Sequence, residues 1–196
     1  MIRPAIIANT QEEFNERFSN VAYADVIHLD LMDGEFVPNT SLLFDVALPK
    51  KTFHWHLMAK NPYSFIETLP GTVFYVHVET VNVHEHKVYC KKHNLPVCLA
   101  VNPGTALPDL EGVDKLLIMT VVPGQYGAPF VESATAKIKA IPKHIEVCVD
   151  GGMTPATLQH AKYADYIVSG SYLQKNGEKE YEEMSKQYAS VQIPRT

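Results

Sequence analysis

The segment IHLDLMDG, residues 27–34, places polar side chains within a run that is as apolar as a buried strand. Successive side chains of a strand point to opposite faces, so His28, Asp30 and Met32 share one face. An ionised carboxylate that is buried without a partner is strongly destabilising, or its pKa shifts until it is neutral. We therefore expect a partner opposite the side chain of Asp30.

Two further segments carry side chains of the same kind. His56 and Met58 share one face of the apolar run 52–58, and Asp150 ends the run 146–149 in the sequence VDGG. Two imidazoles and two carboxylates that converge form a mixed nitrogen and oxygen site, which suits one divalent transition metal such as zinc, iron, manganese or cobalt. Such an ion would be the partner of the buried aspartate.

The pattern of the whole chain predicts how these segments are positioned. Short runs rich in valine, isoleucine and leucine are typical of buried parallel strands, and eight of them are found, at 5–8, 26–31, 52–58, 73–78, 96–101, 115–121, 146–149 and 166–169. Polar segments with helical spacing lie between several of these runs, at 10–18, 84–93, 132–141 and 154–163, and a closing amphipathic helix is expected over 177–190.

Alternation of strand and helix predicts an α/β fold, a single (β/α)8 TIM barrel domain over residues 1–196. A doubly wound open sheet is the alternative. Barrels typically have about 250 residues, so some connecting helices of this shorter chain must be shortened. There is little room for a helix in three of the connections, 40–51, 62–72 and 103–114. We expect Asn9 or Thr10 to cap the first helix, and Thr154 to cap a helix that has Pro155 at its first position.

Composition excludes several classes of partner. The 196 residues carry a formal net charge of −5, which gives no electrostatic footprint for nucleic acid or an anionic membrane, so a small-molecule partner is expected. The three cysteines form no CxxC pair, which argues against a disulfide framework or a zinc ribbon. No apolar run approaches the length of a membrane span or resembles a signal peptide, so a cytoplasmic protein is expected.

The motifs, in their order and approximate spacing, resemble those of the ribulose-phosphate 3-epimerases, from about residue 3 to residue 175. They are IHLDLMDGEFVPN (27–39), HLMAKNP (56–62), VHVET (76–80), AVNPGT (100–105), LIMTVVPG (117–124), VDGG (149–152) and VSGS (168–171). The resemblance implies a TIM barrel that inverts carbon 3 of D-ribulose 5-phosphate to give D-xylulose 5-phosphate. It also implies a homo-oligomer, since family members associate as dimers or hexamers.

The resemblance also assigns roles to residues of this chain. The metal ligands of the family correspond to His28, Asp30, His56 and Asp150, and its acid/base pair corresponds to Asp30 and Asp150. The methionines that line the site correspond to Met32, Met58 and Met119. Backbone donors to the substrate phosphate would come from Gly127, Gly151, Gly152, Gly170 and Ser171.

The chemistry of the implied reaction explains these residue types. The hydrogen on carbon 3 is weakly acidic, so a cation must polarise the neighbouring ketone and stabilise the cis-enediolate that forms. Inversion then needs a base on one face of the sugar and an acid on the other, and two aspartates on separate strands can supply them.

The sequence departs from the family at two places. Where the family has PGFGGQ, residues 123–128 read PGQYGA, so Gln125, Tyr126 and Ala128 differ from the family pattern. In the first strand, Ala5 stands where the family has a serine. These changes leave open a 3-epimerase of another ketose phosphate, such as allulose 6-phosphate. A non-catalytic sugar-phosphate or metal-binding barrel is a further alternative, as is a metal-free phosphosugar isomerase or synthase barrel, although the latter does not explain His28 and His56.

Several other polar residues have simpler interpretations. His54, His77 and His84, taken singly, are typical of hydrogen-bonded core histidines, and Asp33 with Gly34 is typical of a turn after the strand. Glu79 follows His77 by two positions, so it either supports the site or binds a neighbouring backbone group.

Overall fold

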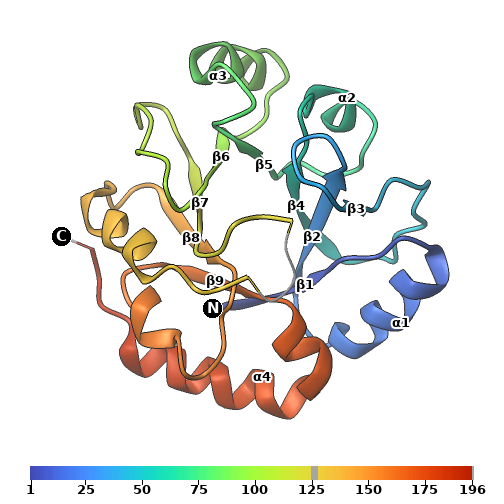
Figure 1. Ribbon diagram of the computed structural model, residues 1–196, viewed down its shortest axis with the longest axis vertical. Helices are drawn as coiled ribbons and strands as arrows, with labels where there is room; N and C mark the ends of the chain where they lie inside the picture. Colours follow the sequence, from blue (N-terminus) through green and yellow to red (C-terminus); the bar gives the residue numbers. More distant parts are fainter. Residues whose placement is uncertain (125–127, 196) are drawn as a thin grey trace.

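The structure is a computed structural model that describes residues 1–124 and 128–195 (Figure 1). Within these residues, eight parallel strands follow one another around a barrel: β1 (Ile2–Ile6), β2 (Val26–Asp33), β4 (Thr52–Met58), β5 (Phe74–His77), β6 (Cys98–Val101), β7 (Lys115–Met119), β8 (Glu146–Asp150) and β9 (Tyr166–Ser169). The barrel closes because β1 pairs with both β9 and β2. The prediction of a (β/α)8 barrel is confirmed, and the open-sheet alternative is wrong.

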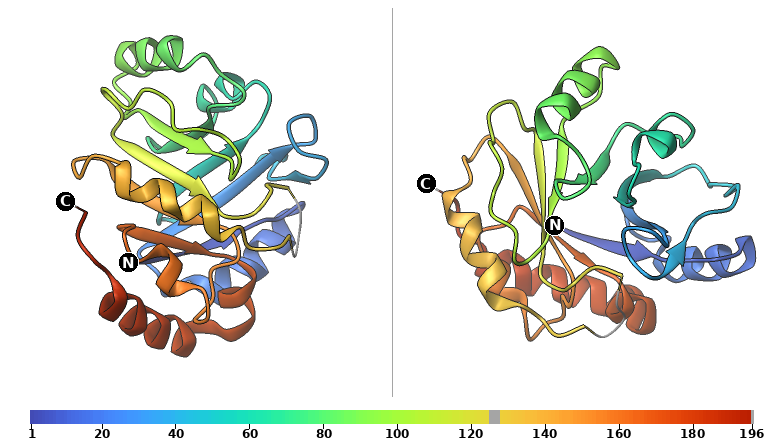
Figure 2. Two further views of the ribbon diagram at one scale, coloured as in Figure 1. Left: turned by 60° about the vertical axis from the view of Figure 1, so that its left-hand side comes forward. Right: turned by 45° about the horizontal axis from the view of Figure 1, so that its top comes forward.

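Helices cover the outside of the barrel, as Figures 1 and 2 show. They are α1 (Gln11–Val21), α2 (Tyr63–Ile66), α3 (Val83–Lys92), α4 (Ser171–Val191) and two 3-10 helices, η1 (Glu132–Ala140) and η2 (Leu158–Ala161). The connections are short as expected: 40–51 holds only the two-residue strand β3 (Thr40–Ser41), and 62–72 holds only the single turn α2. Among the described residues, every helix is too short or too polar to cross a bilayer.

The first and last helices begin differently from each other. Thr10 caps α1, because its hydroxyl accepts a hydrogen bond from the backbone N–H of Glu13 at 3.1 Å, as predicted. The last helix, α4, begins at Ser171 instead of residue 177 and bends at Gly177, whose φ of 73° is outside the helical region. Tyr23, just after α1, contacts Tyr181 of α4 with ring centroids 4.9 Å apart, so the two helices lie side by side.

Segment 132–141 does not form the predicted α-helix but the 3-10 helix η1. The hydroxyl of Thr135 donates to the carbonyl of Glu132 at 2.8 Å, a local bond that competes with regular helical hydrogen bonding. The apolar periodicity was sufficient to predict a helix but not to distinguish its type.

The predicted helix over 154–163 is also wrong. Only Leu158–Ala161 is helical, and Thr154 is not its cap, because the N–H of Thr154 donates to the hydroxyl of Thr157 at 2.9 Å. The single hydrogen of that hydroxyl is within reach of the carbonyls of Gly152, at 2.9 Å, and Thr154, at 3.1 Å. The threonine therefore organises a turn at a position where the sequence pattern predicts a helix.

The first strand begins at Ile2, three residues earlier than predicted. The predicted run began at residue 5 and did not include Arg3, whose side chain is buried. There it forms an ion pair with Glu146 at 3.0 Å and lies over the ring of Tyr166, 3.7 Å from its centroid. A paired and stacked guanidinium is compatible with a strand in the interior.

Strand register places the polar side chains in the barrel interior. Asp30 is paired in register with His56, Met32 with Met58, and Met119 with Asp150. Alternate residues of the same strands face outward and pack against the helices, while the three cysteines are free and buried. The register brings predicted site residues from four strands to the same end of the barrel.

The outward faces of the strands near α1 pack into a buried apolar cluster. Phe14 of α1 is fully buried in the cluster that covers Leu29 and Trp55. Substitution Phe14→Ala should therefore lower the free energy of unfolding by about 3–5 kcal/mol, measured by urea denaturation. Phe18→Ala, on the same helix but only partly buried, should lower it less, and equal losses would contradict the assignment of Phe14 to the core.

Candidate metal and active site

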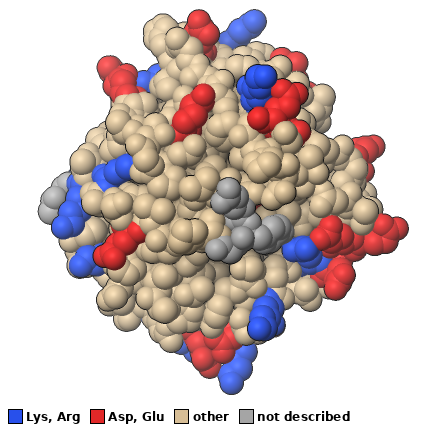
Figure 3. Space-filling view, in the orientation of Figure 1, with Lys and Arg blue, Asp and Glu red and all other residues tan. Residues whose placement is uncertain are grey.

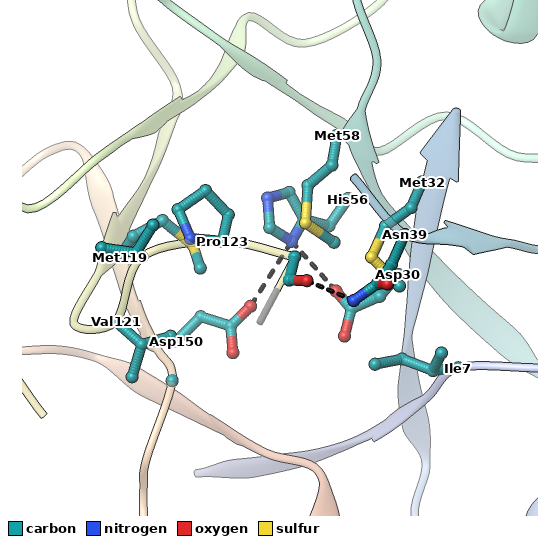
Figure 4. Close-up of a pocket in the computed structure, with 13 residues that line it drawn as sticks. Ile7, Asp30, Met32, Asn39, His56, Met58, Met119, Val121, Pro123 and Asp150 are labelled. Carbon is teal, nitrogen blue, oxygen red and sulfur yellow. Dashed lines mark hydrogen bonds and ion pairs between the residues drawn. The ribbon is translucent and has the colours of Figure 1, made fainter. Parts of the chain in front are cut away.

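A pocket of about 470 Å³ opens at the carboxyl ends of the strands, the end of a TIM barrel where active sites form (Figure 4). Its lining comes from strands and from the loops that follow them, and consists of Ile7, Asp30, Met32, Asn39, His56, Met58, Met119, residues 121–124, Asp150 and Gly151. On the face seen in Figure 3, charged side chains of both signs are scattered among uncharged residues.

Two histidines and two aspartates meet beside this pocket, and three of the four, Asp30, His56 and Asp150, line it. They are His28, Asp30, His56 and Asp150, all buried, and each offers a nitrogen or oxygen atom within 4.8 Å of the others. Nδ1 of His56 lies 2.9 Å from Oδ1 of Asp30 and 3.5 Å from Oδ2 of Asp150. Nε2 of His28 lies 3.5 Å and 3.6 Å from the same two oxygens.

His28 provides a test of whether this group fits a metal ion. Its side chain is fully buried, yet neither ring nitrogen has a hydrogen-bond partner among the described residues, which is rare for buried polar atoms. Ligands bound tetrahedrally at about 2.1 Å are separated from one another by about 3.4 Å, close to the distances from Nε2 to the two carboxylates. The four residues could therefore hold one divalent ion, and their mixed nitrogen and oxygen donors do not distinguish which metal it is.

The electrostatics of the group also favour a cation between the carboxylates. Burial and the charge of Asp30 raise the pKa of Asp150 to about 6, although His56 opposes the shift. Burial acts to lower the pKa of His56, but the hydrogen bonds to Asp150 and Asp30 outweigh it and raise that pKa to about 9. Burial together with the charge of His56 holds the pKa of His28 well below its usual value. A single positive charge is thus stabilised at Nδ1 of His56, on the side facing both carboxylates.

The other predicted site residues are distributed as follows. Met32, Met58 and Met119 line the pocket, and so does Gly151. A Cβ atom at Gly151, whose φ is 109°, would approach Val121 to 2.5 Å, so only glycine fits there.

The remaining predicted residues lie outside the pocket lining or outside the described residues. Gly152 lies beside Phe130, while Gly170 and Ser171 form the start of α4. Gly127 lies outside the described residues, as do Gln125 and Tyr126 of the altered loop. Ala5 is buried inside the barrel, and its carbonyl accepts a hydrogen bond from the side chain of Gln174.

The sequence interpretation of the other polar residues is partly correct. Asp33 makes the expected turn, because Oδ1 accepts from the N–H groups of Glu35 and Phe36. His77 is buried and hydrogen-bonded, as expected, and His54 is buried too. His84 is exposed on α3, so the expectation of a core position was wrong there.

The sequence interpretation missed the contact of Asn39 with Gly124 and that of His77 with His56, while it left open whether Glu79 supports the site. The side chain of Asn39 donates to the carbonyl of Gly124 and joins the loop after β2 to the loop after β7 across the pocket (Figure 4). Nε2 of His77 lies 2.8 Å from Nε2 of His56, and Nδ1 of His77 lies 3.1 Å from Glu79. The sequence signals that could have indicated these contacts are Asn39, which ends the motif FVPN, and the spacing of His77 and Glu79 in VHVET.

Known proteins resemble the chain in sequence and in structure. Residues 1–174 match the model of the ribulose-phosphate 3-epimerase family. A "Ribulose-phosphate 3-epimerase" from Synechocystis is 34% identical, covering 87% of this chain and 86% of the relative. A "Ribulose-phosphate 3-epimerase, cytoplasmic isoform" from Oryza sativa is 32% identical over 76% and 75% of the two chains.

Solved structures share the fold at low sequence identity. The KGPDC structure from Streptococcus mutans gives a TM-score of 0.67 at 12% identity, covering 97% of each chain. A 3-hexulose-6-phosphate synthase from Salmonella typhimurium gives 0.66 at 15% identity, covering 97% of this chain and 99% of the other. These similarities establish the barrel fold alone.

Proposed function

The chain belongs to the ribulose-phosphate 3-epimerase family, and we propose that it inverts carbon 3 of D-ribulose 5-phosphate to give D-xylulose 5-phosphate. One observation carries the proposal: two histidines and two aspartates are buried together beside the pocket, and the ring nitrogens of His28 have no hydrogen-bond partner among the described residues. A protein that only bound a sugar phosphate would have no need of two facing carboxylates there.

Four residues would hold the metal in this proposal: His28, Asp30, His56 and Asp150. A bound divalent ion would polarise the ketone at carbon 2 and stabilise the negative charge that develops when carbon 3 loses its proton. The side chains of Met32, Met58 and Met119 would cover the reacting carbons with an adaptable apolar surface and exclude water.

Asp30 and Asp150 would carry the protons in this reaction. They come from β2 and β8, and Figure 4 shows them on different sides of the pocket. One carboxylate would remove the proton from carbon 3, and the other would deliver a proton to the opposite face of the planar enediolate. The raised pKa of Asp150 suits a group that must hold a proton for part of the cycle.

Backbone N–H groups would bind the phosphate. The proposed donors are Gly127, Gly151, Gly152, Gly170 and Ser171, of which Gly170 and Ser171 begin α4. The first N–H groups of a helix have no partner within the helix and favour an anion.

The reaction can be tested by loading the protein with Zn²⁺, Mn²⁺ or Fe²⁺ in D₂O and adding D-ribulose 5-phosphate. We expect NMR to detect D-xylulose 5-phosphate with deuterium at carbon 3, because the new proton comes from a group that exchanges with solvent. The chelator-treated protein is the control. Absence of both inversion and exchange with every metal would contradict the proposal.

A second substrate is favoured by one observation. Ala5 stands inside the barrel at the position of a family serine, so one hydroxyl near the substrate is missing. A 3-epimerase of a six-carbon ketose phosphate, such as allulose 6-phosphate, is therefore the alternative. The ratio of kcat/KM for the two sugars decides between them.

A further inference from the structure

A row of hydrogen bonds leads from the proposed metal site into the wall of the barrel. Nε2 of His56 on β4 contacts Nε2 of His77 on β5 at 2.8 Å. Nδ1 of His77 contacts Oε2 of Glu79 at 3.1 Å, and Oε1 of Glu79 accepts from the backbone N–H of Asn102 at 2.9 Å. The ring of His77 is fully buried, so both of its nitrogens depend on these protein partners for their hydrogen bonds.

The direction of these hydrogen bonds follows from the carboxylate at the end of the row. An ionised carboxylate only accepts, so Nδ1 of His77 carries the hydrogen and Nε2 of a neutral His77 is an acceptor. The contact between the two Nε2 atoms then requires the hydrogen to be on His56. Nδ1 of His56 faces Asp30 and Asp150, and it is the nitrogen whose hydrogen a metal ion would replace.

We propose that His77 and Glu79 are positioning residues that hold His56 in the tautomer whose Nδ1 binds the metal. The proposal rests on the proposed function only in requiring the metal site. The opposite tautomer of His56 would require a hydrogen on Nε2 of His77. If a neutral His77 carried its hydrogen on Nε2, its Nδ1 would have a lone pair. That lone pair would face Oε2 of Glu79 at 3.1 Å, and the two would repel each other.

A doubly protonated His77 is also unfavourable in the loaded protein. It would place a buried positive charge one ring away from a bound dication, and like charges destabilise one another strongly in a dry interior. The neutral His77 with its hydrogen on Nδ1 is therefore the form consistent with the distances and with a bound metal.

The surroundings of the row keep it rigid and dry. The ring of Phe36, from the loop after β2, lies over His77 with centroids 4.8 Å apart. The loop that presents Asn102 to Glu79 is fixed by Lys137 of η1, whose ammonium donates to the carbonyls of Asn102 and Pro103 at 3.0 Å and 2.7 Å. Such outer partners set the orientation and basicity of a histidine ligand.

The test measures zinc affinity of the metal-free protein by competition with a chromophoric chelator. His77→Phe keeps the ring but removes the acceptor, so the affinity should fall by about 10- to 100-fold. His77→Gln restores an acceptor near the position of Nε2 and should recover most of the loss. His86→Phe is the matched control, because His86 is an equally buried histidine on α3 and should leave zinc affinity unchanged.

A second readout reports the tautomer directly. In the zinc-loaded protein with ¹⁵N-labelled histidine, NMR should show a hydrogen on Nε2 of His56 and on Nδ1 of His77. If His77→Phe does not fold, Glu79→Gln tests the same row at a more exposed position, with a smaller expected loss of affinity.

The outcomes separate this proposal from the proposed function. Wild-type zinc affinity in His77→Phe, or a hydrogen on Nε2 of His77, would overturn the positioning role while leaving the epimerase proposal intact. Failure of the wild-type protein to bind zinc, iron, manganese or cobalt would overturn the metal site, and the positioning role with it.

Discussion

Replacement of either Asp30 or Asp150 by asparagine is expected to lower the rate of epimerisation by about 10³-fold, because each variant lacks one of the two groups that move a proton. The two variants should differ in which of the two sugars they can still deprotonate. D-ribulose 5-phosphate and D-xylulose 5-phosphate differ only at carbon 3, so their C3–H bonds point to opposite faces of the enediolate plane. Each remaining aspartate can therefore act on only one of the two sugars.

The measurement that checks this is exchange of the C3 hydrogen in D₂O, followed by NMR for each sugar with each variant. Asp30→Asn should exchange deuterium into one sugar without inversion, and Asp150→Asn should do so with the other. Asparagine keeps one oxygen ligand, so the metal content of both variants must be measured alongside. The raised pKa of Asp150 predicts that this group holds a proton more readily than an ordinary aspartate in the metal-free protein.

Two results would contradict the mechanism with two proton carriers. Exchange into the same sugar by both variants would mean that a single group serves both faces. Inversion at the wild-type rate by either fully loaded variant would mean that the altered aspartate is only a ligand.

The barrel could be predicted because its strands are short, continuous apolar runs, a pattern that depends on local sequence alone. The candidate metal group could be predicted for a related reason. His28 and Asp30 are two positions apart, as are His56 and Met58, so strand geometry places them on the same face without knowledge of the fold.

The features that were missed depend on contacts between distant segments. The burial of Arg3 requires Glu146, which is 143 positions away, and the contact of Asn39 with Gly124 spans 85 positions. The 3-10 helices are a separate case, because the hydroxyls of Thr135 and Thr157 bond to carbonyls only three to five positions away, and the apolar pattern does not report such local bonds. His77 was interpreted as a core residue because nothing in its own strand indicates that His56 lies opposite.

Substitution His28→Leu is expected to abolish metal-dependent activity while leaving the metal-free protein as stable as before, or about 1–2 kcal/mol more stable. The reason is that the ring of His28 is fully buried without a hydrogen-bond partner among the described residues. Leucine has a similar size and carries no polar atom to desolvate. With one of four ligands lost, the rate with added metal should fall by about 10³-fold or more, since a metal supplies several kcal/mol to the reaction.

Denaturation with and without zinc separates the two effects. Zinc should stabilise the wild-type protein, because it binds only the folded state, and should stabilise His28→Leu far less. His54→Leu is the matched control: His54 is buried in the same interior, in register with His28, but is outside the group of four. It should leave zinc binding intact.

A large loss of stability in metal-free His28→Leu, together with normal zinc binding, would show that the histidine serves the fold and not the ion. The expected result is the reverse, because the geometry around His28 lacks what a structural histidine needs. Its Nε2 lies 3.5 Å and 3.6 Å from two carboxylates, too far for good hydrogen bonds and close to the separation of ligands around one ion. The unpaired ring of His28 therefore lowers the stability of the metal-free fold, and a bound cation would supply the missing partner.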